Sequence, residues 1–114
     1  MPTAIYDRFD VVVVPFPFTD KAAEKRRPAL VLSSAKAFNR VIEHSVMAMI
    51  TSADNAPWPL DTEIADLKAA GLSSASVIRM KLFILDHRFV IRKAGQLAES
   101  DQGKFQKMFA QAFA

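Results

Sequence analysis

The sequence contains no cysteine, and its 114 residues include only two histidines. Without cysteine the chain can form no disulfide framework and no thiolate nucleophile, and zinc sites that use cysteine are excluded. His44 and His87 form no His-rich metal motif, because they are isolated from one another in the sequence. We therefore expect a protein that uses no metal and no other cofactor.

Long apolar runs are also missing. No stretch approaches the roughly 20 apolar residues that cross a bilayer, and residues 1–8 lack the basic and apolar segments of a signal peptide. A chain of 114 residues can bury about two-thirds of the surface that its unfolded form exposes, which suffices for one core. These features predict a single domain over residues 1–114, located in the cytoplasm and without a membrane partner.

The excess of positive charge is small, with a formal net charge of +3. The basic residues nevertheless fall into two groups, which are Lys21, Lys25, Arg26, Arg27, Lys36 and Arg40, followed later by Arg79, Lys81, Arg88, Arg92 and Lys93. If the fold brings these groups together, they form a basic groove that could bind a polyanion such as a nucleic acid.

The most informative stretch is residues 10–33, where two apolar runs flank a polar segment. Residues 11–18 are rich in valine and phenylalanine but include two prolines, which predicts an edge strand or a strand that runs out into a loop. Residues 28–33 predict a second strand. Arg27 precedes Pro28, so its backbone should be extended, and its planar guanidinium could hold two phosphate oxygens. Alternatively, Lys25 to Arg27 form a solvated basic turn that protects a sheet edge.

The rest of the chain predicts further short strands and one long helix. Strands are expected at residues 44–51, in a central position, and at 60–64, 76–84 and 87–92, with a helical turn at 65–71 that ends at Gly71. A C-terminal amphipathic helix should begin with Ser100 as its N-cap and pack a stripe of Phe105, Met108, Phe109, Ala112 and Phe113 against the sheet. The pattern predicts a mainly β (α+β) fold, a small antiparallel barrel closed by this helix.

The paired motifs at residues 10–20 and 26–33 resemble the N-terminal signature of the MazF/PemK growth-inhibiting toxins, and the likeness continues over nearly the full chain. It includes Met49 to Ser52, Ala70 to Leu72, and the stretch from Ser76 to Asp86. The resemblance implies an SH3-like barrel and a sequence-specific, metal-independent endoribonuclease of a type II toxin–antitoxin system. Such a toxin cleaves single-stranded RNA as a homodimer, is inhibited by a cognate antitoxin, and meets DNA only through that antitoxin.

The resemblance also implies site residues. It places the catalytic arginine of the family on Arg27 and its strand-end threonine on Thr51, and it matches Arg79 to an arginine near the scissile bond. We assign RNA binding to Lys25, Arg26, Ser52, Arg79 and Lys81. Two alternatives are open: Thr51 is an ordinary strand residue whose hydroxyl caps a turn, and Arg79 is a charge on the solvent face of a strand.

The general base is not assigned. His44 and His87 have the appropriate ordinary pKa, but a surface or structural role is the commoner one for an isolated histidine. Asp20 and Glu24 could act from the loop. Lys81 lies where some family members carry an acidic or amide side chain.

Two further features bear on the site and its partners. Phe9 replaces a usual glycine of the family, which predicts an altered turn before the first strand. Trp58, with Pro57 and Pro59, could anchor the antitoxin.

Two other functions remain open, a toxin that binds a protein target as the related gyrase poisons do, and a non-catalytic barrel that binds RNA or a peptide.

Overall fold

The computed structural model of this chain describes residues 4–16 and 25–114, and in these ranges six strands form one antiparallel sheet in the order β4-β5-β3-β2-β1-β6. The strands are β1 (Asp10–Phe16), β2 (Lys25–Val31), β3 (His44–Ser52), β4 (Thr62–Glu63), β5 (Ser76–Asp86) and β6 (Arg92–Gln96). The helical segments are a π-helical turn (Ala35–Asn39) that continues into α1 (Arg40–Ile42), then α2 (Leu67–Ala70), a 3-10 turn (His87–Phe89) and α3 (Glu99–Ala112).

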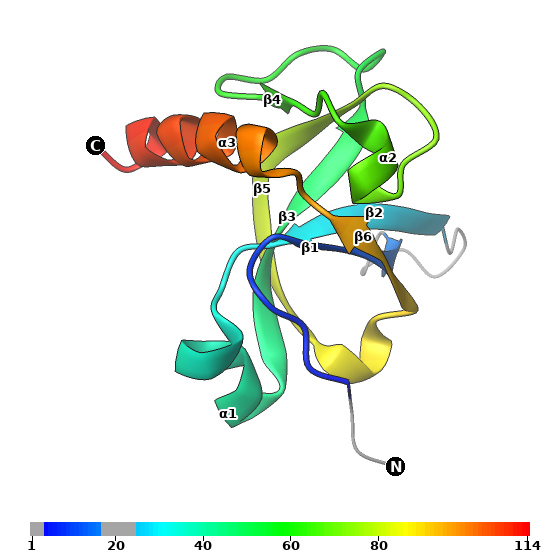
Figure 1. The fold of residues 1–114 in the computed structure, drawn as a ribbon, viewed down its shortest axis with the longest axis vertical. Coiled ribbons are helices and arrows are strands. Elements are labelled where there is room, and N and C mark those ends of the chain that lie inside the picture. Colours follow the sequence, from blue (N-terminus) through cyan, green and yellow to red (C-terminus); the bar gives the residue numbers. More distant parts are fainter. Residues whose placement is uncertain (1–3, 17–24) are drawn as a thin grey trace.

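The sheet curls into half of a barrel, with β4, α2 and α3 towards one end and α1 towards the other (Figure 1). The mainly β fold with a C-terminal helix is therefore confirmed, as is the central position of β3. Within the described residues, no helix is long and apolar enough to span a membrane.

Both faces of the central strands are buried, and this explains their nearly continuous apolar sequences. On one face, Val11, Leu30 and Ile50 pack in a cluster that also contains Phe105 of α3. On the other face, a second cluster is formed by Val12, Val14, Ala29, Val31, Met47 and Leu85. Side chains alternate between faces along a strand, so consecutive residues such as Leu30 and Val31 enter different clusters.

Of the two readings of the first strand, an edge position does not apply, because β1 pairs with β2 on one side and β6 on the other. Its proline is accommodated at the exit of the strand. The pairing with β6 ends at Val13 and Arg92, so Pro15 lies beyond it and removes no hydrogen bond from that ladder.

Strands β2 and β3 separate at Pro28. Leu32 donates its backbone N–H to Val46 of β3, and because the N–H groups of a strand alternate in direction, the nitrogens of Leu30 and Pro28 also face β3. Proline has no N–H to donate. The ladder accordingly begins only at Ala29, and the first residues of β2 pair with β1 alone. The gap lies between the start of β2 and the end of β3.

A bulge in β5 lies opposite this gap. Ala48 pairs with Leu82 and Ile50 pairs with Ile78, so residues 79–81 of β5 oppose the single residue Met49 of β3. Bulges redirect side chains and are common beside functional sites. This one contains both Arg79 and Lys81.

Four features of the structure differ from the sequence-based expectations. The helical residues 35–42 were not expected, and the segment after β5 begins with the 3-10 turn, not with a strand, so that β6 starts only at Arg92. The helix α3 starts at Glu99 with Ala98 as its N-cap, and no side chain caps it. Its predicted core stripe is buried only in part, since Phe105 is buried whereas Phe113 is 67% exposed.

The turn before β1 keeps a left-handed backbone at Phe9, with φ of 72°. Glycine favours this conformation, so Phe9 takes up the backbone that a glycine would provide, at some cost in strain. Its N–H donates to the carbonyl of Val31, and its carbonyl accepts from the N–H of Leu97. The buried ring joins the core. The replacement therefore does not itself require an altered turn.

Candidate functional site

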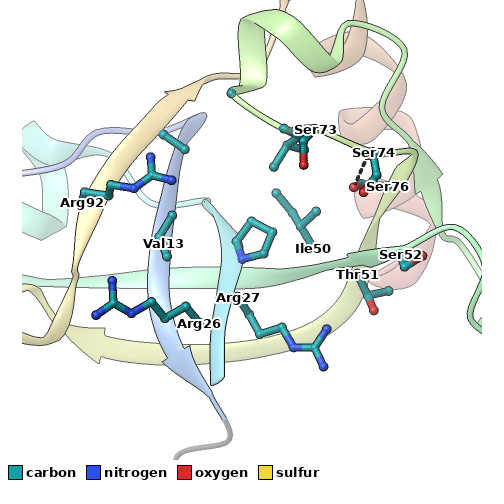
Figure 2. A pocket seen from close by; sticks show the side chains of 14 residues that line it. Val13, Arg26, Arg27, Ile50, Thr51, Ser52, Ser73, Ser74, Ser76 and Arg92 are labelled. Atoms are coloured by element: carbon teal, nitrogen blue, oxygen red, sulfur yellow. Dashed lines mark hydrogen bonds between the residues drawn. The ribbon is translucent and has the colours of Figure 1, made fainter. Parts of the chain in front are cut away.

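A hollow of about 380 Å³ opens where β2 and β3 separate. Figure 2 shows that side chains from the first half of β2, the end of β3 and the loop after α2 converge on it. Its lining consists of Val13, Arg26, Arg27, Pro28, Ile50, Thr51, Ser52, Gly71, Leu72, Ser73, Ser74, Ser76, Arg92 and Ala94. The surface thus combines three arginines with several hydroxyl groups, a composition that suits an anion.

Arg26 and Arg27 point in different directions, and only Arg27 extends towards Thr51 (Figure 2). Alternation along β2 explains this, because Arg27 shares its sheet face with Ala29 and Val31, whereas Arg26 lies on the opposite face. No residue in the described ranges forms an ion pair or a side-chain hydrogen bond with Arg27. Its guanidinium is therefore available to a ligand.

The hydroxyl of Thr51 is oriented by Asn55, whose side-chain nitrogen donates to Thr51 Oγ1 over 2.6 Å. Because that oxygen already accepts a hydrogen bond, the hydroxyl can donate its own hydrogen elsewhere. Thr51 lies on the same face of β3 as Met47, and hence on the face that carries Arg27. The neighbouring Ser52 accepts from the N–H of Asp54 over 3.2 Å, so it helps to close the turn after β3.

The loop after α2 is set against β6 by a close backbone approach. Gly71 has φ of 74°, and a Cβ atom built on it would lie 2.1 Å from the carbonyl oxygen of Ala94. A Cβ built on Gly95 would in turn lie 2.4 Å from the carbonyl oxygen of Ala69. Only glycine fits at these positions, and the contact carries the loop with its serines to the edge of the hollow.

The start of α2 is anchored by a buried carboxylate on α3. Asp101 is fully buried and accepts from the N–H groups of Ala65 and Asp66 over 3.1 and 3.0 Å. Burial alone would raise its pKa, but these donors and Lys104 lower the pKa of Asp101 below its ordinary value. Asp66 then caps α2 by accepting from Ala69 N–H over 3.0 Å. Asp101 therefore fixes the helix that presents the loop.

A second, smaller hollow of about 110 Å³ adjoins Arg27 and Thr51. It is lined by Phe16, Arg27, Met49, Ile50, Thr51, Trp58, Arg79 and Lys81. The Arg79 guanidinium lies 4.9 Å from the centre of the Trp58 ring, and the Lys81 ammonium lies 5.0 Å from that of Phe16. This hollow is thus both aromatic and cationic, in contrast to the hydroxyl-rich first one.

Arg79 is not on the solvent face of its strand, as one reading of the sequence had it. It is only 8% exposed, and its Nε and Nη2 donate to the two carboxylate oxygens of Asp61 over 3.2 and 3.0 Å. Nη2 also donates to the carbonyl of Ala56. Burial would raise the pKa of Asp61, but Arg79 and the Trp58 N–H lower it, so this carboxyl stays ionised at neutral pH.

Neither histidine lines either hollow. His87 is buried and its Nε2 lies 2.6 Å from Ser45 Oγ; burial lowers the pKa of His87, so the ring is neutral near pH 7. His44 packs at the start of β3, with Nδ1 2.7 Å from the carbonyl oxygen of Ile42. Both histidines therefore have structural surroundings. Asp20 and Glu24 lie outside the described residues. Within the described residues, no group of three or more metal-ligating side chains occurs.

Four of the predicted site residues line the first hollow, namely Arg26, Arg27, Thr51 and Ser52. Arg79 and Lys81 line the second hollow. Lys25 is exposed at the start of β2 and lines neither hollow. Sequence reasoning did not assign Asn55, Asp61, Ser73, Ser74 or Arg92 to the site. Arg92 had a signal, because it belonged to the second basic group. Asp61 had none, since its partner Arg79 is distant in the sequence.

A family model described as "PemK-like, MazF-like toxin of type II toxin-antitoxin system" matches residues 7–113. Among solved structures, MazF from Deinococcus radiodurans has a TM-score of 0.73 at 22% identity, covering 96% of this chain and 97% of that one. A MazE–MazF complex from the same organism has a TM-score of 0.75 at 23% identity, with coverage of 96% and 97%.

A third structure, titled an endoribonuclease in complex with its cognate antitoxin from a mycobacterial species, has a TM-score of 0.73 at 16% identity, covering 95% of this chain and 94% of that one. No curated protein matches the sequence significantly. The structural likenesses establish a shared fold, and the family model spans all but the ends of the chain. The chain therefore belongs to the PemK-like, MazF-like family of toxins of type II toxin–antitoxin systems.

Proposed function

We propose that this toxin is a metal-independent, sequence-specific endoribonuclease that cleaves single-stranded RNA. The observation that carries the proposal is the meeting of Arg27 and Thr51 at the gap between β2 and β3, on one face of the sheet. Arg27 has an unpaired guanidinium among the described residues, and Thr51 has a hydroxyl whose hydrogen is free to donate. Family membership supports the same activity.

The proposed reaction begins when the 2′-hydroxyl of the RNA attacks the adjacent phosphate. The oxygen–phosphorus bond to the 5′-oxygen then breaks, leaving a 2′,3′-cyclic phosphate and a 5′-hydroxyl. One proton leaves the 2′-oxygen and another reaches the departing 5′-oxygen. Arg27 donates two parallel N–H bonds to the phosphate oxygens as negative charge builds up on them. Thr51 donates to the scissile phosphate and fixes its orientation, and Asn55 holds the hydroxyl in place.

The remaining polar residues bind the RNA backbone around the cut. Arg26 and Arg92 supply positive charge along the first hollow, and Ser52 with the serines of the α2–β5 loop supplies hydroxyl donors. Lys25 extends the basic surface along β2, whereas Arg79 and Lys81 add positive charge at the second hollow. These contacts make binding depend on salt, because they replace counterions at phosphates.

Cleavage of single-stranded RNA in the presence of EDTA tests this proposal. We expect full activity without divalent cations, and products with 2′,3′-cyclic phosphate and 5′-hydroxyl ends, which end-specific labelling identifies. A strict requirement for added magnesium or zinc contradicts the mechanism. A control reaction with RNA methylated at every 2′-oxygen should give no products, because the attacking hydroxyl is then absent.

We further propose that residues 1–114 act as one toxin domain in the cytoplasm, as a homodimer, and are inhibited by a cognate antitoxin. Solved structures of related toxins are titled as complexes with an antitoxin. An extended acidic and apolar segment could cover the basic hollows and exclude RNA by charge and bulk, with Trp58 as an anchor. Any contact with DNA would then run through the antitoxin.

One observation supports a second candidate, a toxin that acts by binding a protein target. No carboxylate or imidazole among the described residues lines either hollow, so this part of the chain offers no general base there. Asp20 and Glu24 are testable as proton-transfer groups by substitution with Asn and Gln. Growth inhibition by the protein without any RNA cleavage would favour this second function.

A further inference from the structure

The hollow beside Trp58 is not used by the proposed chemistry, although it shares Arg27 and Thr51 with the site. It lies on the sheet face towards which these two side chains are directed, because Met49 and Thr51 alternate to the same side of β3. A group bound there would be next to the phosphate held by Arg27.

Trp58 is held rigidly at the mouth of this hollow. Its backbone N–H donates to Asp61 Oδ2 over 2.9 Å, and its carbonyl accepts from the N–H of Asp61 over 3.4 Å. Pro57 and Pro59 flank it and restrict the backbone further. An aromatic ring whose backbone is already fixed loses little conformational entropy when it contacts a ligand.

Arg79 supports the ring from one side. Its guanidinium is buried, paired with both oxygens of Asp61, and stacked over Trp58. Trp58 nevertheless remains 44% exposed, so part of the ring is open to a ligand. Nη1 of Arg79 donates to none of the described residues, which leaves that nitrogen able to donate to a ligand.

We propose that this hollow is a nucleobase subsite, in which the base next to the scissile phosphate stacks on Trp58, and that Trp58 thereby determines cleavage specificity. The inference rests on the proposed function, because the base is placed relative to a phosphate held by Arg27. Aromatic rings bind bases by stacking, and the neighbouring cations Arg79 and Lys81 can donate to acceptors on the base edge. Asp61 is a positioning residue that holds both Arg79 and the Trp58 backbone.

The first test maps the cut sites of the wild type, Trp58→Phe and Trp58→Ala in a random-sequence RNA library. We expect Trp58→Ala to lose preference at one position beside the cut by about 5- to 100-fold, which is the usual effect of removing a stacking aromatic. Trp58→Phe should keep the same preferred base with weaker discrimination. The matched control is Phe89→Ala, since Phe89 is also exposed beneath an arginine that pairs with an aspartate, yet it lines neither hollow.

The second test uses the single tryptophan of the chain as a probe. Titration with short 2′-O-methylated homopolymers of A, C, G and U, which cannot be cleaved, should quench Trp58 fluorescence most strongly with the preferred base. If the wild type cleaves RNA but Trp58→Ala keeps every preference and no homopolymer changes the fluorescence, the subsite is refuted and the endoribonuclease stands. If the wild type cleaves no RNA, the proposed function fails. In that case, base-dependent quenching of Trp58 fluorescence still supports the subsite, and the absence of such quenching overturns the subsite as well.

Discussion

Arg27 and Arg79 differ in what surrounds their guanidinium groups, and this decides what each can do. Arg79 is paired with Asp61, so its charge is largely compensated, and removal of either partner would leave a buried charge alone, which commonly costs about 3–5 kcal/mol. Arg27 has no such partner among the described residues. A phosphate can therefore bind Arg27 without displacing an existing ion pair.

Replacement of Arg27 provides the sharpest test at the scale of a residue. Arg27→Ala should lower the cleavage rate by about 10²- to 10³-fold, because one preorganised donor to the transition state is lost. Stability should change by less than about 0.5 kcal/mol, since Arg27 forms no ion pair or side-chain hydrogen bond with the described residues. Arg27→Lys keeps the charge but not the planar fork, so it should restore activity only in part. Single-turnover cleavage and urea unfolding measure both effects.

Arg26→Ala is the matched control for Arg27. The two residues are adjacent, but alternation places them on opposite faces of β2, and Figure 2 shows the side chains diverging. We expect Arg26→Ala to weaken RNA binding in a salt-dependent manner and to leave the rate of the bound complex nearly unchanged. Equal loss of turnover in both variants would contradict the catalytic assignment of Arg27.

How much of the site the sequence predicted depends on the range of the contacts. The direction of Arg27 followed from its place before Pro28 and from strand alternation, which are local rules. The pairing of Arg79 with Asp61 could not be predicted, because a loop and a bulge bring these two together across the sequence. Pairing between distant groups is set by the tertiary fold, and no periodicity in the sequence reports it.

At the scale of elements, the same distinction holds. The strand β1 follows from its dense β-branched sequence, β2 and β3 follow from their apolar runs, and α3 follows from the spacing of its aromatic residues. The start of α3 was misplaced because Ser100 and Asp101 resemble a helix cap and its first turn. In the structure the Asp101 carboxylate instead accepts from residues before α2. The Asp101 side chain could have capped its own helix, but it accepts hydrogen bonds from backbone N–H groups that are distant in the sequence.

Asp101 gives the prediction that belongs to these elements. Asp101→Asn replaces one acceptor oxygen by a donor that faces a backbone N–H, so we expect about 1–3 kcal/mol lower unfolding free energy at pH 7. The folded pKa of Asp101 lies below its unfolded value, so its contribution is complete above the unfolded pKa of about 3.9 and is lost as pH falls through the folded pKa. Urea unfolding from pH 7 down to pH 3 should therefore show the difference between wild type and variant shrinking with acidity. A difference that stays constant below pH 4 would contradict this assignment.

At the scale of the whole molecule, the outer part of β5 is left without a partner strand in the described ranges. The short strand β4 pairs only with Ile78 and Val77, so β5 beyond the bulge has an open edge. Leu82 and Ile84 alternate to one face there and are 38% and 60% exposed. A long, apolar strand edge invites association with another chain. An isologous contact with a second copy would cover it.

The dimer prediction follows from that edge. Light scattering at micromolar concentration should report twice the mass of the chain, and Ile84→Asp should reduce it to that of a monomer, because the partner copy would have to bury a charge at the symmetric contact. Phe113→Asp is the control, since Phe113 is 67% exposed and directly follows α3, whose C-terminal end lies away from the end of β5 that leads into the 3-10 turn (Figure 1). Ile84 is exposed, so the variant should still fold as a monomer, and it should lose only the stabilisation that dimerisation adds. RNA cleavage should fall because a monomer offers the substrate only half of a continuous basic groove. A wild-type monomer with full activity would refute the dimer, whereas a monomer produced by Phe113→Asp and not by Ile84→Asp would move the interface to α3.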